Sequence, residues 1–103
     1  MTSNLKEWLA LNGYSQDNLN SVGKYGNSAI MKASREANLS IVDELISLNV
    51  DLNVKNIDGN SALWNACFGD SYACFEALVS AGINIDSQNV NNVTSLMYCA
   101  SAG

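Results

Sequence analysis

The chain contains no histidine and no proline, and charged residues make up only 15% of its 103 residues. Without histidine, Ser-His-Asp and Cys-His nucleophilic sites are excluded, and the commonest zinc ligand is missing. The three cysteines are an odd set without a CxxC spacing, so they predict neither a disulfide framework nor a zinc knuckle. We expect buried, inert thiols in a protein with no catalytic residue, no metal and no cofactor.

Other catalytic chemistry finds little support in the sequence. The adjacent carboxylates Asp43 and Glu44 fall on the predicted solvent side of a helix, where we expect them to be hydrated. Gly23 and Gly26 are not followed by the Lys-Ser/Thr signature of a phosphate-binding loop, so we interpret both as turn residues. The sequence therefore predicts a protein that is not an enzyme.

Ten acidic residues against five basic ones give a formal net charge of −5. This balance argues against binding to nucleic acid or to anionic membranes, because both favour clusters of Lys and Arg. No apolar run approaches the roughly 18 residues of a membrane span, and residues 1–7 lack the basic and then apolar layout of a secretory signal. We expect a reducing, cytoplasmic location.

Two stretches of the chain are nearly copies of each other, since residues 26–33 read GNSAIMKA and residues 59–66 read GNSALWNA. Their offset is 33 residues, and a further step of 33 reaches residues 92–99, where a similar order of residue types recurs. A fixed period of this length is typical of stacked repeats. At this chain length the repeats form one domain at most.

Apolar periodicity predicts short helices separated by turns. The first covers residues 4–12, with Asn4 and Glu7 as a capping box, and a loop with one helical turn near residues 16–19 follows. Further helices are predicted at about 28–36, 39–48, 61–68, 72–81 and from 94 onward. Ser28 and Ser61 are candidate N-caps, and Leu39 and Tyr72 are predicted among the buried residues of the second and fourth of these helices.

Helix–turn–helix–loop units that open Gly-x-Ser/Thr-x-aliphatic-x-x-Ala resemble the ankyrin repeat. The hydroxyl position is Ser28, Ser61 and Thr94, and the aliphatic position is Ile30, Leu63 and Leu96. The resemblance implies an all-α, ankyrin-type solenoid in one domain, residues 1–103. It would comprise a divergent N-terminal cap and loop at 1–25, repeats at 26–58 and 59–91, and an incomplete repeat at 92–103.

The chain departs from the family pattern at two positions of each repeat. The family proline is replaced by Ala29, Ala62 and Ser95. The family histidine, which tethers neighbouring turns, is replaced by Met31, Trp64 and Met97. None of these three side chains makes that hydrogen bond, so we expect softer loops between repeats.

The resemblance further implies a module that binds a partner protein through its concave inner-helix face and the tips of its inter-repeat loops. Exposed aromatic and aliphatic side chains there would serve as anchors. For Trp64 a second interpretation is open, namely that it fills the space of the missing histidine. The candidate binding residues are Lys24, Tyr25, Asn27, Arg35, Ile57, Asp58, Asn60, Trp64, Phe68, Val90, Asn91 and Val93.

The third unit offers one helix before the sequence stops. Because terminal repeats normally carry a polar outer surface, two explanations compete. The 103 residues are a piece of a longer array, or another chain completes the stack as a homo-oligomer through the C-terminal helix. The second would make the protein a self-assembling scaffold, and a third possibility is a small-molecule or metal site that uses the thiols.

Overall fold

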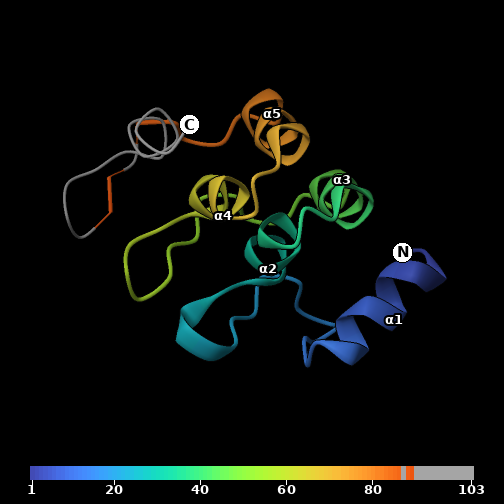
Figure 1. Ribbon diagram of the computed structural model, residues 1–103. Coiled ribbons are helices and arrows are strands. Elements are labelled where there is room, and N and C mark those ends of the chain that lie inside the picture. Colours follow the sequence, from blue (N-terminus) through green and yellow to red (C-terminus); the bar gives the residue numbers. More distant parts are fainter. Residues whose placement is uncertain (87, 90–103) are drawn as a thin grey trace.

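The structure, a computed structural model, describes residues 1–86, 88 and 89. This part of the chain folds into five α-helices and no strand (Figure 1), with an isolated β-bridge between Val22 and Ser28. The helices are α1 (Ser3–Leu11), α2 (Ala29–Arg35), α3 (Leu39–Ser47), α4 (Ala62–Phe68) and α5 (Tyr72–Ser80), with a 3₁₀ helix, η1, at Lys24–Gly26. The predicted all-α class is confirmed.

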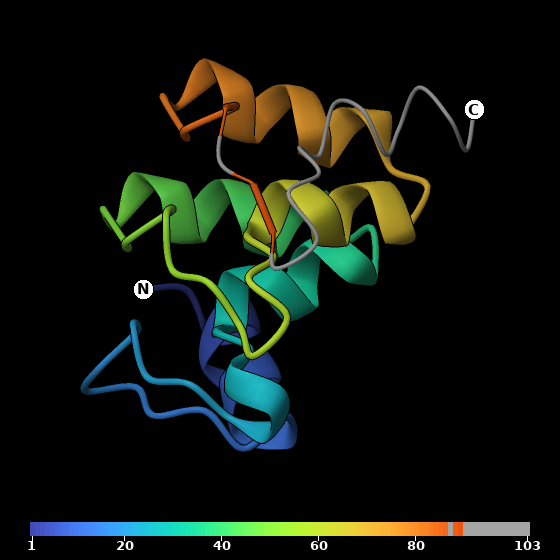
Figure 2. The same cartoon turned by 90° about the vertical axis from the view of Figure 1, so that its left-hand side faces the viewer.

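The helices form two antiparallel pairs that lie side by side (Figures 1 and 2). In the inner layer α2 packs against α4, and in the outer layer α3 packs against α5. Within each pair, α2 contacts α3 and α4 contacts α5, while α1 packs against α3. The predicted stacking of like modules is therefore present, although the boundaries at 25/26, 58/59 and 91/92 stay a prediction.

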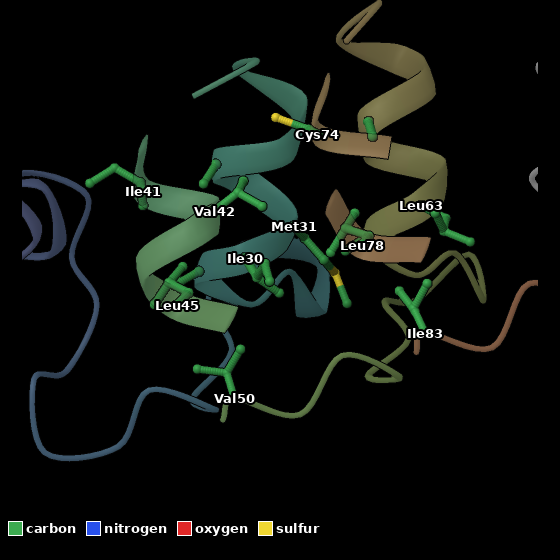
Figure 3. Packing of buried hydrophobic residues seen from close by; sticks show 14 of the residues in the cluster. Ile30, Met31, Ile41, Val42, Leu45, Val50, Leu63, Cys74, Leu78 and Ile83 are labelled. Atoms are coloured by element: carbon green, nitrogen blue, oxygen red, sulfur yellow. The ribbon is translucent and has the colours of Figure 1, made fainter. Parts of the chain in front are cut away.

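The hydrophobic core repeats the same positions in both helix pairs (Figure 3). Ile41 and Leu45 of α3 are buried at the positions that Cys74 and Leu78 take in α5. On the inner helices, Ile30 and Leu63 are likewise buried 33 residues apart. A stack of this kind gains most of its stability from apolar area that one module alone cannot bury.

Two residues predicted for the core are exposed instead. Leu39 is 37% exposed and Tyr72 is 77% exposed, and they occupy the same repeat position at the start of α3 and α5. The reason is geometric: Ile41 and Cys74 lie one helical turn before Leu45 and Leu78 and take the buried face.

The side chains that cap the helix N-termini differ from those that the sequence predicted. The predicted capping box of Asn4 and Glu7 is wrong, because α1 begins at Ser3 and the Leu5 amide donates to Thr2 Oγ1 over 3.2 Å. Side chains of Asn38 and Ser71 cap α3 and α5 in the same way. Ser28 and Ser61 do occupy N-cap positions, but both are buried and neither side chain makes the cap hydrogen bond.

The N-terminal segment consists of α1 and the loop that follows it. The residue after the C-cap has positive φ at Gly13, Ala37, Asn49, Asp70 and Gly82, so all five α-helices end alike. The helical turn predicted at residues 16–19 is absent, because the Ser15 hydroxyl accepts the amides of Asp17 and Asn18 and forms a turn there. α1 packs against α3 of the outer layer, and its role as a divergent N-terminal cap stays a prediction.

A contact at the start of α1 fixes it to α3. The backbone amide and hydroxyl of Thr2 both donate to the Glu44 carboxylate, the amide over 2.6 Å. These hydrogen bonds hold the pKa of the exposed Glu44 below its ordinary value. No helix in the described part of the chain has the length and apolarity needed to cross a membrane.

Candidate partner-binding surface

Two loop tips project on the side of the inner helices (Figure 1). The first is η1, in which Tyr25 has a positive φ of 62° and is 58% exposed. The second is the loop at 57–60, where Ile57 is 67% exposed. The tips are joined directly, since the Ile57 amide donates to the Tyr25 carbonyl over 3.0 Å. Two large side chains are therefore held outward on neighbouring tips.

Asn56 organises the second tip and ties it to the first. Its side-chain oxygen accepts the amides of Asp58 and Asn60, each over 3.0 Å, which closes the turn on itself. Its Nδ2 donates to Asn27 Oδ1 of the first tip over 2.9 Å. One asparagine thus joins neighbouring loops in a chain whose repeats lack the tethering histidine.

A second set of asparagines joins the loops that follow the outer helices. Asn20 Oδ1 accepts the Asp51 amide over 2.7 Å, and one repeat later Asn53 Oδ1 accepts the Asn84 amide over 2.9 Å. The 33-residue period is therefore visible in the hydrogen bonds as well as in the helices. Sequence reasoning missed these residues, although the recurrence of asparagine at 20 and 53 was a usable signal.

The inner helices bring Arg35 of α2 and Phe68 of α4 together. The Arg35 guanidinium carbon lies 5.1 Å from the Phe68 ring centroid, a cation–π distance. Phe68 also contacts Trp64, with ring centroids 6.3 Å apart and a tilt of 41°. Phe68 is half-buried and Arg35 is exposed, so both present surface at the C-terminal ends of the inner helices. We call the surface formed by η1, the 57–60 loop and the exposed sides of α2 and α4 the inner face.

A shallow depression of about 300 Å³ lies in the inner face. It opens between the loop that follows α1, the η1 tip and the inner helices. Its described lining residues are Asn12, Tyr14, Gly23, Lys24, Tyr25, Asn27, Lys32, Arg35 and Asn65. Every lining residue except Gly23 has an amide, hydroxyl or cationic side-chain group, and none of these residues carries a carboxylate.

An aromatic wall supports one side of this depression. The rings of Trp8 and Tyr14 are stacked 6.0 Å apart, and Trp8 Nε1 donates to Glu36 Oε1 over 3.2 Å. The Tyr14 hydroxyl donates to the Asn27 carbonyl over 3.1 Å. Burial of the ring, with a smaller contribution from the charge of Glu36, raises the pKa of Tyr14 above its ordinary value of 10.0. Tyr14 is therefore a neutral donor at physiological pH.

The predicted binding residues differ in how much of their surface is exposed. Lys24, Tyr25, Arg35, Ile57 and Asp58 are exposed, and their binding role stays a prediction. Val90, Asn91 and Val93 lie outside the described residues.

Two of the predicted residues offer almost no surface. Asn60 is 6% exposed and Trp64 is 2% exposed, and Asn27 is half-buried within the loop hydrogen bonds. Met31 shares the repeat position of Trp64 and is also buried, at 1% exposed. This burial favours the second interpretation of Trp64, in which the ring fills the space of the missing histidine.

The cysteines differ from the sequence expectation at one position. Cys74 is a free, fully buried thiol of the core. Cys67, predicted to be an inert thiol, is instead disulfide-bonded. Among residues 1–86, 88 and 89, no three His, Cys, Asp or Glu side chains are grouped as a metal site would require.

Comparison with known protein families places these observations in context. A family model described as ankyrin repeats, in three copies, matches residues 30–103. A comparison with curated proteins gives no significant match. Ankyrin repeats generally act as non-enzymatic protein–protein interaction modules. With the helix pairs stacked as described and most of its length matched, the chain belongs to the ankyrin repeat family.

Proposed function

We propose that this protein binds a partner protein through its inner face and carries out no catalysis itself. The observation that supports the proposal most strongly is the pair of exposed side chains Tyr25 and Ile57, which project from tips that a backbone hydrogen bond joins. Phe68, at the C-terminal end of α4, adds half-buried aromatic surface against Arg35 of α2. Exposed aromatic and aliphatic side chains on a rigid support are typical anchors of protein interfaces.

Rigid presentation is the proposed mechanism. Both tips are fixed before a partner arrives, by the three hydrogen bonds of the Asn56 side chain and by the Ile57 amide. A surface that is ordered in the free protein loses little conformational entropy on binding, so more of the contact energy appears as affinity. The proposed ligand is another protein, with no nucleic acid or membrane.

The experiment is affinity capture from the source cell with Ile57→Ser/Phe68→Ala. We expect the variant to lose at least about tenfold of the partner recovered by the wild type, because two anchors are removed. Tyr72→Ala is the matched control, since Tyr72 is 77% exposed on the outer helix α5 and should leave recovery unchanged. Circular dichroism should show the same helix content in all three proteins.

Two results would contradict the proposal. Equal recovery by the wild type and by Ile57→Ser/Phe68→Ala would move the binding surface elsewhere. A molecular mass that rises with concentration, with no foreign protein recovered, would favour the self-assembling scaffold.

A further inference from the structure

The basic residues of this acidic protein are concentrated in one place. The depression of the inner face is lined by Lys24, Lys32 and Arg35, which are three of the five Lys and Arg residues of a chain with net charge −5. No described lining residue is acidic. A local cluster of one sign inside a surface of the opposite sign selects ligands by charge.

Two of these cations have no carboxylate partner among the described residues. In the described part of the chain the salt bridge is that of Lys32 Nζ with Glu36 Oε2, at 3.4 Å, and neither Lys24 nor Arg35 takes part in one. The Nζ atom of Lys24 lies 5.0 Å from the centroid of the Tyr25 ring, and the guanidinium group of Arg35 lies over the Phe68 ring. A cation–π contact orients the cation but leaves its N–H donors able to bind an oxygen acceptor.

The three cations that line the depression come from η1 and α2, and their equivalents one repeat later are not basic. One repeat further on, Lys24 is replaced by Ile57, Lys32 by Asn65 and Arg35 by Phe68. Asn65 is buried and donates to the Ser61 carbonyl over 3.0 Å, whereas Ile57 and Phe68 contribute apolar surface. Across a single repeat the inner face therefore changes from three cations to the apolar side chains of Ile57 and Phe68, beside which Asp58 is an exposed carboxylate.

We propose that the depression binds an acidic segment of the partner protein. Asp or Glu side chains of that segment would accept hydrogen bonds from Lys24 and Arg35, and apolar residues next to them would contact Ile57 and Phe68. This inference rests on the proposed function and adds the chemistry of the ligand. At 0.1 M salt the Debye length is about 10 Å, so carboxylates elsewhere on the surface are largely screened while direct pairs in the depression are not.

The experiment measures the affinity of fluorescein-labelled hexaglutamate by fluorescence anisotropy at 0.1 M salt. We expect Lys24→Gln/Arg35→Gln to weaken binding about five- to tenfold, since two ion pairs are lost. The matched control is Lys6→Gln/Lys55→Gln, which makes the same charge change at exposed residues outside the depression and should weaken binding less than about twofold. If Arg35→Gln lowers the helix content, Lys24→Gln/Lys32→Gln replaces it with the same change of charge.

Four results would overturn the inference. They are no measurable binding of hexaglutamate by the wild type, equal binding of hexaglutamine, equal loss in both double variants, and tighter binding of a six-nucleotide thymidine strand. The captured partner provides the separate test of the proposed function. If Ile57→Ser/Phe68→Ala loses that partner but Lys24→Gln/Arg35→Gln keeps it, the binding module stands and the acidic ligand is wrong.

Discussion

The two helix pairs have the same arrangement of helices and similar buried residues, but their exposed side chains differ. Ile30 and Leu63, Ile41 and Cys74, and Leu45 and Leu78 are buried at equivalent positions. On the inner face the positions equivalent to Lys24, Lys32 and Arg35 differ in chemistry, since one repeat later they are apolar or amide side chains. The difference indicates that stacking constrains the buried positions of each repeat, whereas the exposed positions are available for recognition.

The largest expected effect comes from Gly69, which takes the repeat position of Glu36. A Cβ at Gly69 would meet the Arg35 carbonyl oxygen and lie 2.8 Å from the Ser34 carbonyl oxygen, because the C-termini of α2 and α4 touch. Gly69→Ala should lower the free energy of unfolding by about 3 kcal/mol, as measured by urea denaturation. At the equivalent position Glu36, no preceding inner helix in the described structure packs against the residue. Glu36→Ala should therefore lower the free energy of unfolding by less than about 1 kcal/mol. Equal stability of Gly69→Ala and the wild type would show that the two helix ends are not in contact.

The next effect tests the asparagines that join the loops. Asn56→Ala removes three side-chain hydrogen bonds at a half-buried position and should lower the free energy of unfolding by about 2 kcal/mol. Asn53→Ala removes one inter-loop hydrogen bond at an exposed position and should cost about 0.5 kcal/mol. Urea denaturation of both variants provides the comparison. A larger loss in Asn53→Ala would reverse the assigned importance of the two loops.

The smallest expected effect is a dependence of stability on pH that comes from the N-terminal segment and not from the two helix pairs. Tyr14 takes the position after the helix end that Val50 and Ile83 take in the repeats, and it alone of the three can ionise. Because its pKa is raised in the folded state, the unfolded chain loses the Tyr14 proton first as the pH passes 10.0. Stability is therefore retained below that pH and declines above it. The urea midpoint should fall more steeply above pH 10 in the wild type than in Tyr14→Phe, and parallel curves would exclude this origin.

The fold could be predicted from the sequence because its main signals are periodic. The 33-residue recurrence and the apolar spacing within each helix predicted α2 to α5 to within one or two residues. Start signals were less informative, since Thr2 rather than Asn4 caps α1. Any of several neighbouring polar residues can cap a helix, and only the packing of α1 on α3 decides among them.

The surface was harder to predict because exposure depends on neighbouring modules. The sequence left two interpretations of Trp64 open, a binding residue or a filler of the histidine space, and its burial at the position where Met31 is also buried favours the second. Asn56 was overlooked because a loop asparagine looks like a solubilising residue, and only the folded loops show that its amide reaches Asn27. The basic depression combines η1, α2 and the loop after α1, so no local pattern contains it.

The most direct test of the central claim is amide hydrogen exchange of the protein with and without its captured partner. The account predicts slower exchange on binding at residues 24–27 and 57–60 and at the C-terminal ends of α2 and α4, with α3 and α5 unchanged. Protection confined to α3 and α5 would place the partner on the outer helices and contradict the proposal that the inner face is the binding surface.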